Sequence, residues 1–291
     1  MSLLSPKTLL AIKDLQLVAK TVIDGFMTGA NRSSIKGPGL EFSQYRSYQP
    51  GDDLRWLDWK MFARSDRYYI RESEVDTSIS VRFVVDASAS MAHPDSGLTK
   101  MDYARFLTAS LAWLAALQGD AVGLYTLQQG DVFALSPKQG LRYASRLFYQ
   151  LEQLVPGGNF TGETLYKPVF AGSRNRELVI VVTDLYERNN EIMQMLDMLS
   201  ALKNEVLVFH LLGRNELDME FTGFTTLEDL ETGEQLEIDP STKADYQQKM
   251  DTHLAQIRLH LAGKNIAYRM VCMDQPLDQA LRDFLVQRNK A

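Results

Sequence analysis

The chain has 291 residues, of which 45% are hydrophobic and 23% are charged. This composition supplies enough apolar side chains for a buried core, and it excludes the disordered and fibrous classes of protein. The formal net charge at pH 7 is -6. Because nucleic-acid-binding proteins normally concentrate Lys and Arg on one face, this charge argues against nucleic acid as a partner.

The chain contains one cysteine, Cys272, in the apolar run IAYRMVCM. A single cysteine excludes an intrachain disulfide and a thiolate metal cluster, and its apolar neighbours predict a buried, inert thiol. The N-terminal residues lack the basic and apolar regions of a secretory signal, and no apolar run approaches the roughly 18 residues of a membrane span. We therefore expect a cytoplasmic protein without a transmembrane segment.

The first predicted element is an amphipathic helix over residues 5–27, in which apolar residues recur at helical spacing after Ser5 and Pro6. Glycines from Gly25 onward are expected to end it. Residues 28–74 are rich in Arg, Tyr, Trp and Asp and follow neither the helical nor the strand period, which favours turns and short strands. We expect residues 1–77 to form a helix with an irregular, partly β appendage.

From Ser80 onward, strand and helix patterns alternate. The strands are continuous apolar runs, which is typical of a mostly parallel sheet covered by helices on both faces. The predicted fold class is therefore α/β, a doubly wound domain over residues 78–291. A β-hairpin insertion near residues 221–239 interrupts the alternation, because Thr232-Gly233 lies between two strand-like runs. The predicted strands are 81–85, 120–127, 131–136, 178–182, 205–212 and 266–272, and the predicted helices are 101–117, 141–154, 164–170, 191–202, 241–261 and the residues after Pro276.

Polar side chains follow two of these strands and a loop between them. Ligands of open parallel sheets bind outside the carboxyl ends of the strands, so the residues at those ends are candidates for a site. Mg²⁺ prefers oxygen ligands, which these loops offer, whereas the four scattered histidines argue against zinc. Asp and Ser in such places also serve as helix caps or turn residues, which is the alternative interpretation. The candidate metal ligands are Asp86, Ser88, Ser90, Asn159, Thr161 and Asp184.

The D-x-S-x-S run from Asp86 to Ser90, the Gly-Gly loop at 157–158 and the pair Thr183-Asp184 together resemble the metal-ion-dependent adhesion site of von Willebrand factor A domains. The resemblance implies that the two serines ligate Mg²⁺, or else Mn²⁺ or Ca²⁺, directly and that the two aspartates act partly through water. It also implies an open coordination position for an acidic side chain of a protein partner. Where this family usually has threonine the chain has Asn159, so Asn159 and Thr161 are alternative ligands from the second loop.

Residues 41–64, EFSQYRSYQPGDDLRWLDWKMFAR, are similar to the signature of a family of bacterial proteins, domain of unknown function 58. Together with the A-domain-like half, the resemblance covers nearly the whole chain. It implies association with a MoxR-type AAA+ ATPase. Many members carry N-terminal membrane helices, which this chain is expected to lack.

The signature segment has two physical interpretations. Pro50-Gly51 presets a tight turn with carboxylates at its corner, which nearby arginines can hold in forked ion pairs as a structural clamp. The second interpretation is a recognition surface, with tryptophans and exposed arginines as anchors for a partner. The sequence alone does not decide between these two interpretations. The carboxylates are Asp52 and Asp53, the arginines are Arg46, Arg55 and Arg64, and the tryptophans are Trp56 and Trp59.

No catalytic machinery is predicted. Ser88 lies outside any G-x-S-x-G motif, His93 is expected in an exposed loop, and a phosphate-binding G-x-x-x-x-G-K-[ST] motif is missing from the sequence. We expect a non-enzymatic, metal-dependent adaptor that supports protein assembly or cofactor insertion in a client. The alternatives are a Mg²⁺-dependent phosphatase that uses Asp86 as nucleophile, and a structural interaction domain with an empty metal site.

Overall fold

The computed structural model describes residues 6–12, 14–32, 44–49, 57–72, 78–128, 130–171, 176–187, 189–218, 225–228, 230, 233, 235–238 and 243–288. The chain divides into two compact units. One is Ala30–Ser78, and the other combines Met1–Gly29 with Ile79–Ala291. The N-terminal helical residues thus belong to the α/β unit, which differs from the predicted division after residue 77.

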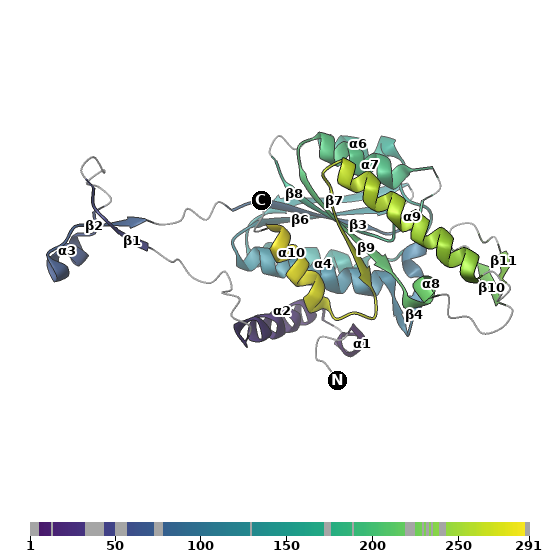
Figure 1. Cartoon of the computed structure of the whole chain (residues 1–291), viewed down its shortest axis with the longest axis horizontal. Helices are drawn as coiled ribbons and strands as arrows, with labels where there is room; N and C mark the ends of the chain where they lie inside the picture. Colours follow the sequence, from purple (N-terminus) through teal and green to yellow (C-terminus); the bar gives the residue numbers. More distant parts are fainter. Residues whose placement is uncertain are drawn as a thin grey trace. The chain divides into compact units, whose positions relative to one another are not determined.

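A six-stranded sheet forms the centre of the larger unit (Figure 1). Its strands are β3 (Ser80–Asp86), β6 (Ala121–Gln128), β7 (Asp131–Lys138), β8 (Leu178–Thr183), β9 (Glu205–Leu212) and β12 (Ala267–Cys272). The strand order is β12-β9-β8-β3-β6-β7, and all neighbouring pairs are parallel except the antiparallel pair of β6 and β7. The predicted α/β class with a mostly parallel sheet is confirmed.

Helices cover both faces of this sheet. They are α2 (Leu15–Arg32), α4 (Lys100–Leu117), α5 (Leu141–Gln153), α6 (Glu163–Ala171), α7 (Glu191–Ala201), α9 (Lys243–Gly263) and α10 (Leu277–Arg288). Helices α2, α4, α5 and α10 share one hydrophobic core with Phe83 and Phe209 of the sheet, while α6, α7 and α9 share a second core with Val84 and Val208 (Figure 1). Because successive strand residues point to opposite faces, the continuous apolar strands supply both cores.

The N-terminal region forms two helices, α1 (Pro6–Leu9) and α2, so the prediction of one helix over residues 5–27 is wrong. Asp14 begins α2, because its carboxylate accepts a hydrogen bond from Leu17 N at 2.9 Å and its carbonyl accepts one from Val18 N at 3.0 Å. The helix then continues past Gly25 and Gly29. Packing of its apolar face in the first core outweighs the low helix propensity of glycine.

The smaller unit contains β1 (Gln44–Ser47) and β2 (Tyr69–Glu72), which pair antiparallel, and the helix α3 (Trp59–Ser65). Short strands were predicted here, but the helix was not. Its N-cap is Asp58, whose carboxylate accepts hydrogen bonds from the backbone of Lys60 and Met61. Pro50-Gly51 and the acidic residues at its corner lie outside the described residues. The clamp and the recognition surface therefore both stay predictions.

Short elements occupy the loops of the larger unit. They are η2 (Ala89–Ala92), β4 (Pro94–Asp95), β5 (Leu98–Thr99), α8 (Arg214–Asp218), β10 (Thr225–Glu228) and β11 (Gln235–Ile238). Strands β10 and β11 pair antiparallel, as the predicted hairpin insertion requires. Within the described part of the chain, no helix combines the length and the apolar character needed to cross a membrane.

Candidate functional site

The strand order changes direction between β3 and β8. From β3 the sheet continues through β6 and β7 on one side, and through β8, β9 and β12 on the other. Sheets of this kind bind ligands at such a switch point, outside the carboxyl ends of the strands. Asp86 is the last residue of β3 and Asp184 directly follows β8. The two predicted carboxylates therefore lie where the topology favours a ligand.

The loop after β3 places two serine hydroxyls beside the carboxylates. Ser88 Oγ and Ser90 Oγ lie 3.0 Å apart, and Ser90 Oγ donates to Asp184 Oδ1 at 3.1 Å. Ser88 is at the N-cap position of η2 but makes no side-chain capping hydrogen bond. Helix capping therefore does not explain the serines. A turn explains Asp86 in part, because Asp86 Oδ1 accepts a hydrogen bond from Ser88 N at 2.9 Å.

Thr183, the last residue of β8, holds the Asp86 carboxylate. Its Oγ1 donates to Asp86 Oδ2 at 2.7 Å and accepts a hydrogen bond from Leu185 N at 3.0 Å. Leu185 has a φ of 52°, a conformation that costs a non-glycine residue roughly 1 kcal/mol or more. This turn lets Asp184 Oδ1 also accept a hydrogen bond from Tyr186 N at 3.2 Å. The backbone after β8 is thus bent so that it holds the Asp184 carboxylate in place.

The loop between α5 and α6 reaches the site through its backbone. Hydrogen bonds of 2.9 and 2.7 Å join Gly157 and Gly158 to the residues on either side of Ser88. On the same loop, Asn159 is half-buried, while Thr161 is fully buried and its Oγ1 has no hydrogen-bond partner. Because a buried hydroxyl without a partner is costly, Thr161 is the residue of this loop with an unused ligand atom.

Burial gives the two carboxylates different protonation behaviour. Burial and the neighbouring Asp184 carboxylate raise the pKa of Asp86 from 3.8 to about 7, although the hydrogen bonds from Thr183 and Ser88 oppose this shift. Burial also acts to raise the pKa of Asp184, but the Lys100 ammonium and hydrogen bonds to the carboxylate hold it below its usual value. Asp184 is therefore the permanent anion of the pair, and Asp86 is the one that titrates near neutral pH.

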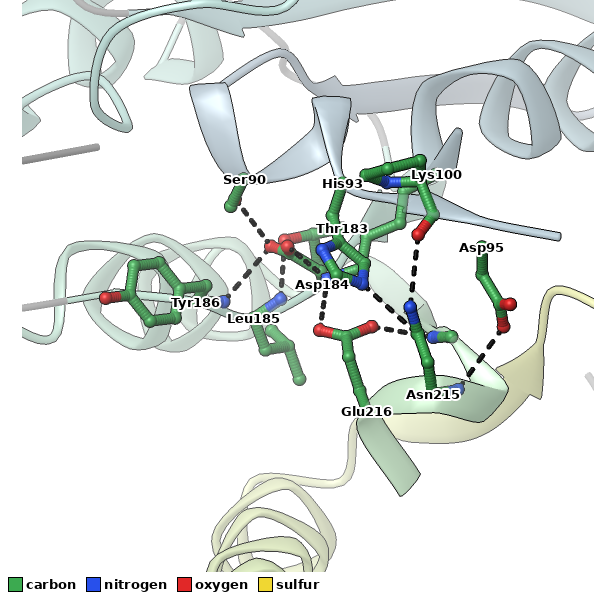
Figure 2. A network of polar contacts seen from close by, with 12 residues as sticks. Ser90, His93, Asp95, Lys100, Thr183, Asp184, Leu185, Tyr186, Asn215 and Glu216 are labelled. Carbon is green, nitrogen blue, oxygen red and sulfur yellow. Dashed lines mark hydrogen bonds and ion pairs between the residues drawn. The ribbon is translucent and has the colours of Figure 1, made fainter. Parts of the chain in front are cut away.

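Two further charged side chains belong to this cluster, and the sequence analysis missed both. Lys100, the first residue of α4, donates from Nζ to Asp184 Oδ2 at 2.9 Å and to Glu216 Oε1 at 2.7 Å. Figure 2 shows the side chains of Asp184 and of Glu216, which lies on α8, pointing toward the ammonium of Lys100. These contacts join residues 84 and 116 positions apart in the chain, so no local spacing in the sequence could have indicated them.

Two histidines and the cysteine complete the surroundings. His93 is half-buried and its Nε2 hydrogen-bonds Asn215 Oδ1 at 3.1 Å, so the prediction of an exposed loop histidine is wrong (Figure 2). Burial lowers the pKa of His210 to about 4, which leaves a neutral imidazole bonded to Tyr268. Cys272 is buried as predicted, and burial raises the pKa of its thiol to about 11. It is therefore an inert thiol.

The donor atoms at the switch point fit a hard divalent cation. In the part of the chain that the structure describes, no three His, Cys, Asp or Glu side chains gather closely enough to hold a metal. A cation here would therefore depend on the Ser88 and Ser90 hydroxyls, together with the two carboxylates and the unused hydroxyl of Thr161. Such an all-oxygen set, completed by water, is one that Mg²⁺, Mn²⁺ and Ca²⁺ accept.

Comparison with known protein families shows which family the chain belongs to. Residues 44–256 match the family described as protein of unknown function DUF58. The chain belongs to the DUF58 family. Uncharacterized proteins of Mycobacterium tuberculosis and Mycobacterium bovis are each 26% identical to this DUF58 protein over 267 residues, which is 89% of this chain and 82% of theirs.

Several solved structures are similar to this DUF58 protein. The conserved hypothetical protein BatB from Bacteroides thetaiotaomicron is 16% identical, with a TM-score of 0.47 over 74% of this chain and 100% of that one. An aerotolerance-related membrane protein from Bacteroides fragilis is 17% identical, with a TM-score of 0.49 over the same shares. The VWA domain of SpRpn10 is 11% identical, with a TM-score of 0.43 over 71% of this chain and 95% of that domain.

Proposed function

We propose that this protein is a non-enzymatic interaction module that holds a divalent cation, Mg²⁺ or else Mn²⁺ or Ca²⁺, and uses it to bind an acidic side chain of a protein partner. The observation that carries the proposal is the cluster of Asp86, Ser88, Ser90 and Asp184 at the switch point of the sheet. Thr161, with its unused hydroxyl, is the proposed ligand from the second loop in preference to Asn159.

Each group has a distinct role in this proposal. The serine hydroxyls, which cap no helix, would ligate the cation directly. The two aspartates would balance its charge, partly through water, and the residues bonded to them would keep them oriented. The cation would supply a Lewis-acidic coordination position that accepts a carboxylate from the partner. A carboxylate ligand from outside would make binding depend on both the metal and the acidic residue.

The geometry disfavours the phosphatase alternative. An aspartyl nucleophile has to reach the phosphorus of its substrate, but only 1% of the Asp86 surface is exposed. Both Asp86 oxygens already accept hydrogen bonds, Oδ1 from Ser88 N and Oδ2 from Thr183 Oγ1. The carboxylate is thus committed to holding the loops together, which suits a binding site better than a nucleophile.

We propose a MoxR-type AAA+ ATPase as the partner, because the resemblance of segment 41–64 to the DUF58 signature implies that association. The module would then help the ATPase to assemble a client protein or to insert a cofactor into it, and it would act in the cytoplasm, where ATP is available. Nucleic acid is not a proposed partner, because the net charge of the chain is -6.

Thermal denaturation tests the metal. A cation that binds only the folded protein raises its free energy of unfolding by about 2.7 kcal/mol at a concentration of 100 times its Kd. We therefore expect Mg²⁺ or Mn²⁺ to raise the melting temperature of the wild type above its value in chelator, and to raise that of Ser88→Ala much less. Ser65→Ala, an exposed serine on α3 that hydrogen-bonds along its own helix, is the matched control and should behave as wild type.

Affinity purification from the native host tests the partner. The wild type should retain an AAA+ ATPase in Mg²⁺ and release it in chelator, whereas Ser88→Ala should retain little of it in either buffer. A wild type that neither gains stability from Mg²⁺ or Mn²⁺ nor loses its partner in chelator would rule out the metal-dependent mechanism.

A second candidate function, a metal-independent interaction domain, is favoured by one observation. The ammonium of Lys100 already forms an ion pair with Asp184 at 2.9 Å, so the site contains a positive charge of its own. This candidate predicts that partner capture is the same in Mg²⁺ and in chelator, and that Ser88→Ala has no effect on it.

A further inference from the structure

Lys100 occupies a position that its local surroundings disfavour. It is the first residue of α4, where the helix dipole opposes a positive charge, and its side chain is only 4% exposed. Thr99 and Asp102 already form the capping box of this helix, so Lys100 is not needed for capping. Its charge is compensated instead by Asp184 and Glu216, at 2.9 and 2.7 Å.

Glu216 is itself held in place on α8. Its Oε2 accepts a hydrogen bond from Gly213 N at 2.7 Å, which leaves Oε1 for Lys100. The backbone carbonyl of Glu216 accepts a hydrogen bond from the Tyr246 hydroxyl at 2.9 Å. Gly213 leaves room for this arrangement, because a Cβ there would lie 3.2 Å from Glu216 Oε2. The Lys100–Glu216 pair is therefore a built part of the site.

The two oxygens of Asp184 are both engaged. Oδ1 accepts hydrogen bonds from Ser90 Oγ and Tyr186 N, and Oδ2 accepts one from Lys100 Nζ (Figure 2). A cation that uses Asp184 must therefore share this carboxylate with the ammonium. With Asp86, Asp184, Glu216 and Lys100 all ionised, the formal charges are three negative and one positive, a sum of -2, which one divalent cation neutralises.

We propose that Lys100 and Glu216 set the affinity of the site for a divalent cation: Lys100 lowers it, and Glu216 offsets part of that effect by taking one hydrogen bond of the ammonium. The inference rests on the proposed metal site. Lys100 then acts as a resident cation that keeps metal binding weak and exchangeable. Removal of Lys100 would leave a formal charge of -3, and neutralisation of Glu216 would leave -1, so the two substitutions have opposite effects on affinity.

The experiment is a titration of the full chain with Mn²⁺ alone, followed by calorimetry or by the paramagnetic signal of free Mn²⁺. Lys100→Met should bind Mn²⁺ at least about tenfold more tightly than the wild type, and Glu216→Gln about tenfold more weakly, because an added or removed unit charge lies within a few ångströms of the cation. The control is Lys167→Met, which removes an exposed lysine that pairs with Glu163 on α6. Its affinity should stay within about twofold of wild type.

The outcomes separate this inference from the proposed function. If the wild type binds Mn²⁺ but Lys100→Met binds it equally or more weakly, the inference is overturned and the metal site stands. If only Lys100→Met binds Mn²⁺, Lys100 is confirmed as the competing cation and the metal-dependent function of the wild type is overturned. If neither binds it, both fail. Should Lys100→Met not fold, Glu216→Gln decides, since equal or tighter binding by that variant overturns the inference.

Discussion

Replacement of Asp86 by asparagine should stabilise the metal-free protein, and the gain should grow as the pH rises from 5 to 8. Burial and Asp184 raise the pKa of Asp86 from 3.8 to about 7, so between these values the folded protein binds a proton that the unfolded chain has lost. The folded state then holds more protons than the unfolded state, and the free energy of unfolding falls as the pH rises through this window. Asparagine carries no titrating group and escapes this loss.

The size of the effect follows from the width of the window. Each pH unit inside it costs up to about 1.4 kcal/mol for one proton, and about two of these units lie between pH 5 and pH 7. The stability difference between Asp86→Asn and the wild type should therefore grow by about 3 kcal/mol from pH 5 to pH 8. The amide can keep the local bonds, because its oxygen can accept from Ser88 N and its NH₂ can donate to Thr183 Oγ1.

Urea denaturation in chelator at pH 5, 6, 7 and 8 measures this difference. All other titrating groups are common to the two proteins, including Asp184, whose lowered pKa places its titration below the window. A stability difference that does not change with pH, or that shrinks as the pH rises, would refute the assignment of the raised pKa to Asp86.

Three further predictions concern the framework of the fold. Gly213→Ala should lower the free energy of unfolding by about 1 kcal/mol in urea titrations, because the new Cβ would push the Asn215 amide away from its hydrogen bond with His93; no loss would contradict the close packing of α8. Arg82→Met should cost about 3 to 5 kcal/mol by calorimetry, since it strands the buried Glu177 carboxylate 2.7 Å away, and the double variant with Glu177→Met should recover much of that loss. Asp14→Ala should cost about 1 kcal/mol, with reduced helical circular dichroism, by removing the N-cap of α2; unchanged stability would show that packing alone fixes its start.

The sheet and the carboxylates of the site could be predicted from sequence because both depend on local patterns. A continuous apolar run such as LVIVV specifies a buried strand, and the polar residues directly after it mark the carboxyl end of that strand. In a parallel sheet those ends meet along one edge, so the contact between Ser90 and Asp184 follows from two local patterns and one topological rule. Each residue is located by its own strand, so the prediction needs no sequence relation between Ser90 and Asp184.

The break between α1 and α2 and the helix α8 could not be predicted in the same way. The apolar residues before and after Asp14 keep the same helical spacing, so the sequence predicts a single helix across the break. Helix α8 has only five residues, which is shorter than the window over which a helical period can be recognised. It is stabilised by contacts with distant residues, such as the hydrogen bond of Asn215 with His93.

Lys100 could not be predicted as part of the site from local sequence patterns. By its sequence neighbours, Lys100 is an ordinary polar residue at the start of a helix, and such residues are usually exposed. It is buried because α4 begins beside Asp184 at the carboxyl end of β8 and because α8 brings a second carboxylate to its ammonium. Motif recognition therefore finds the proposed metal ligands, whereas the cation proposed to compete with the metal is placed only by the fold. In the proposed mechanism the affinity for the cation depends on the balance between these two sets of groups, and for this reason the charge variants at Lys100 and Glu216 are more informative than removal of a proposed ligand.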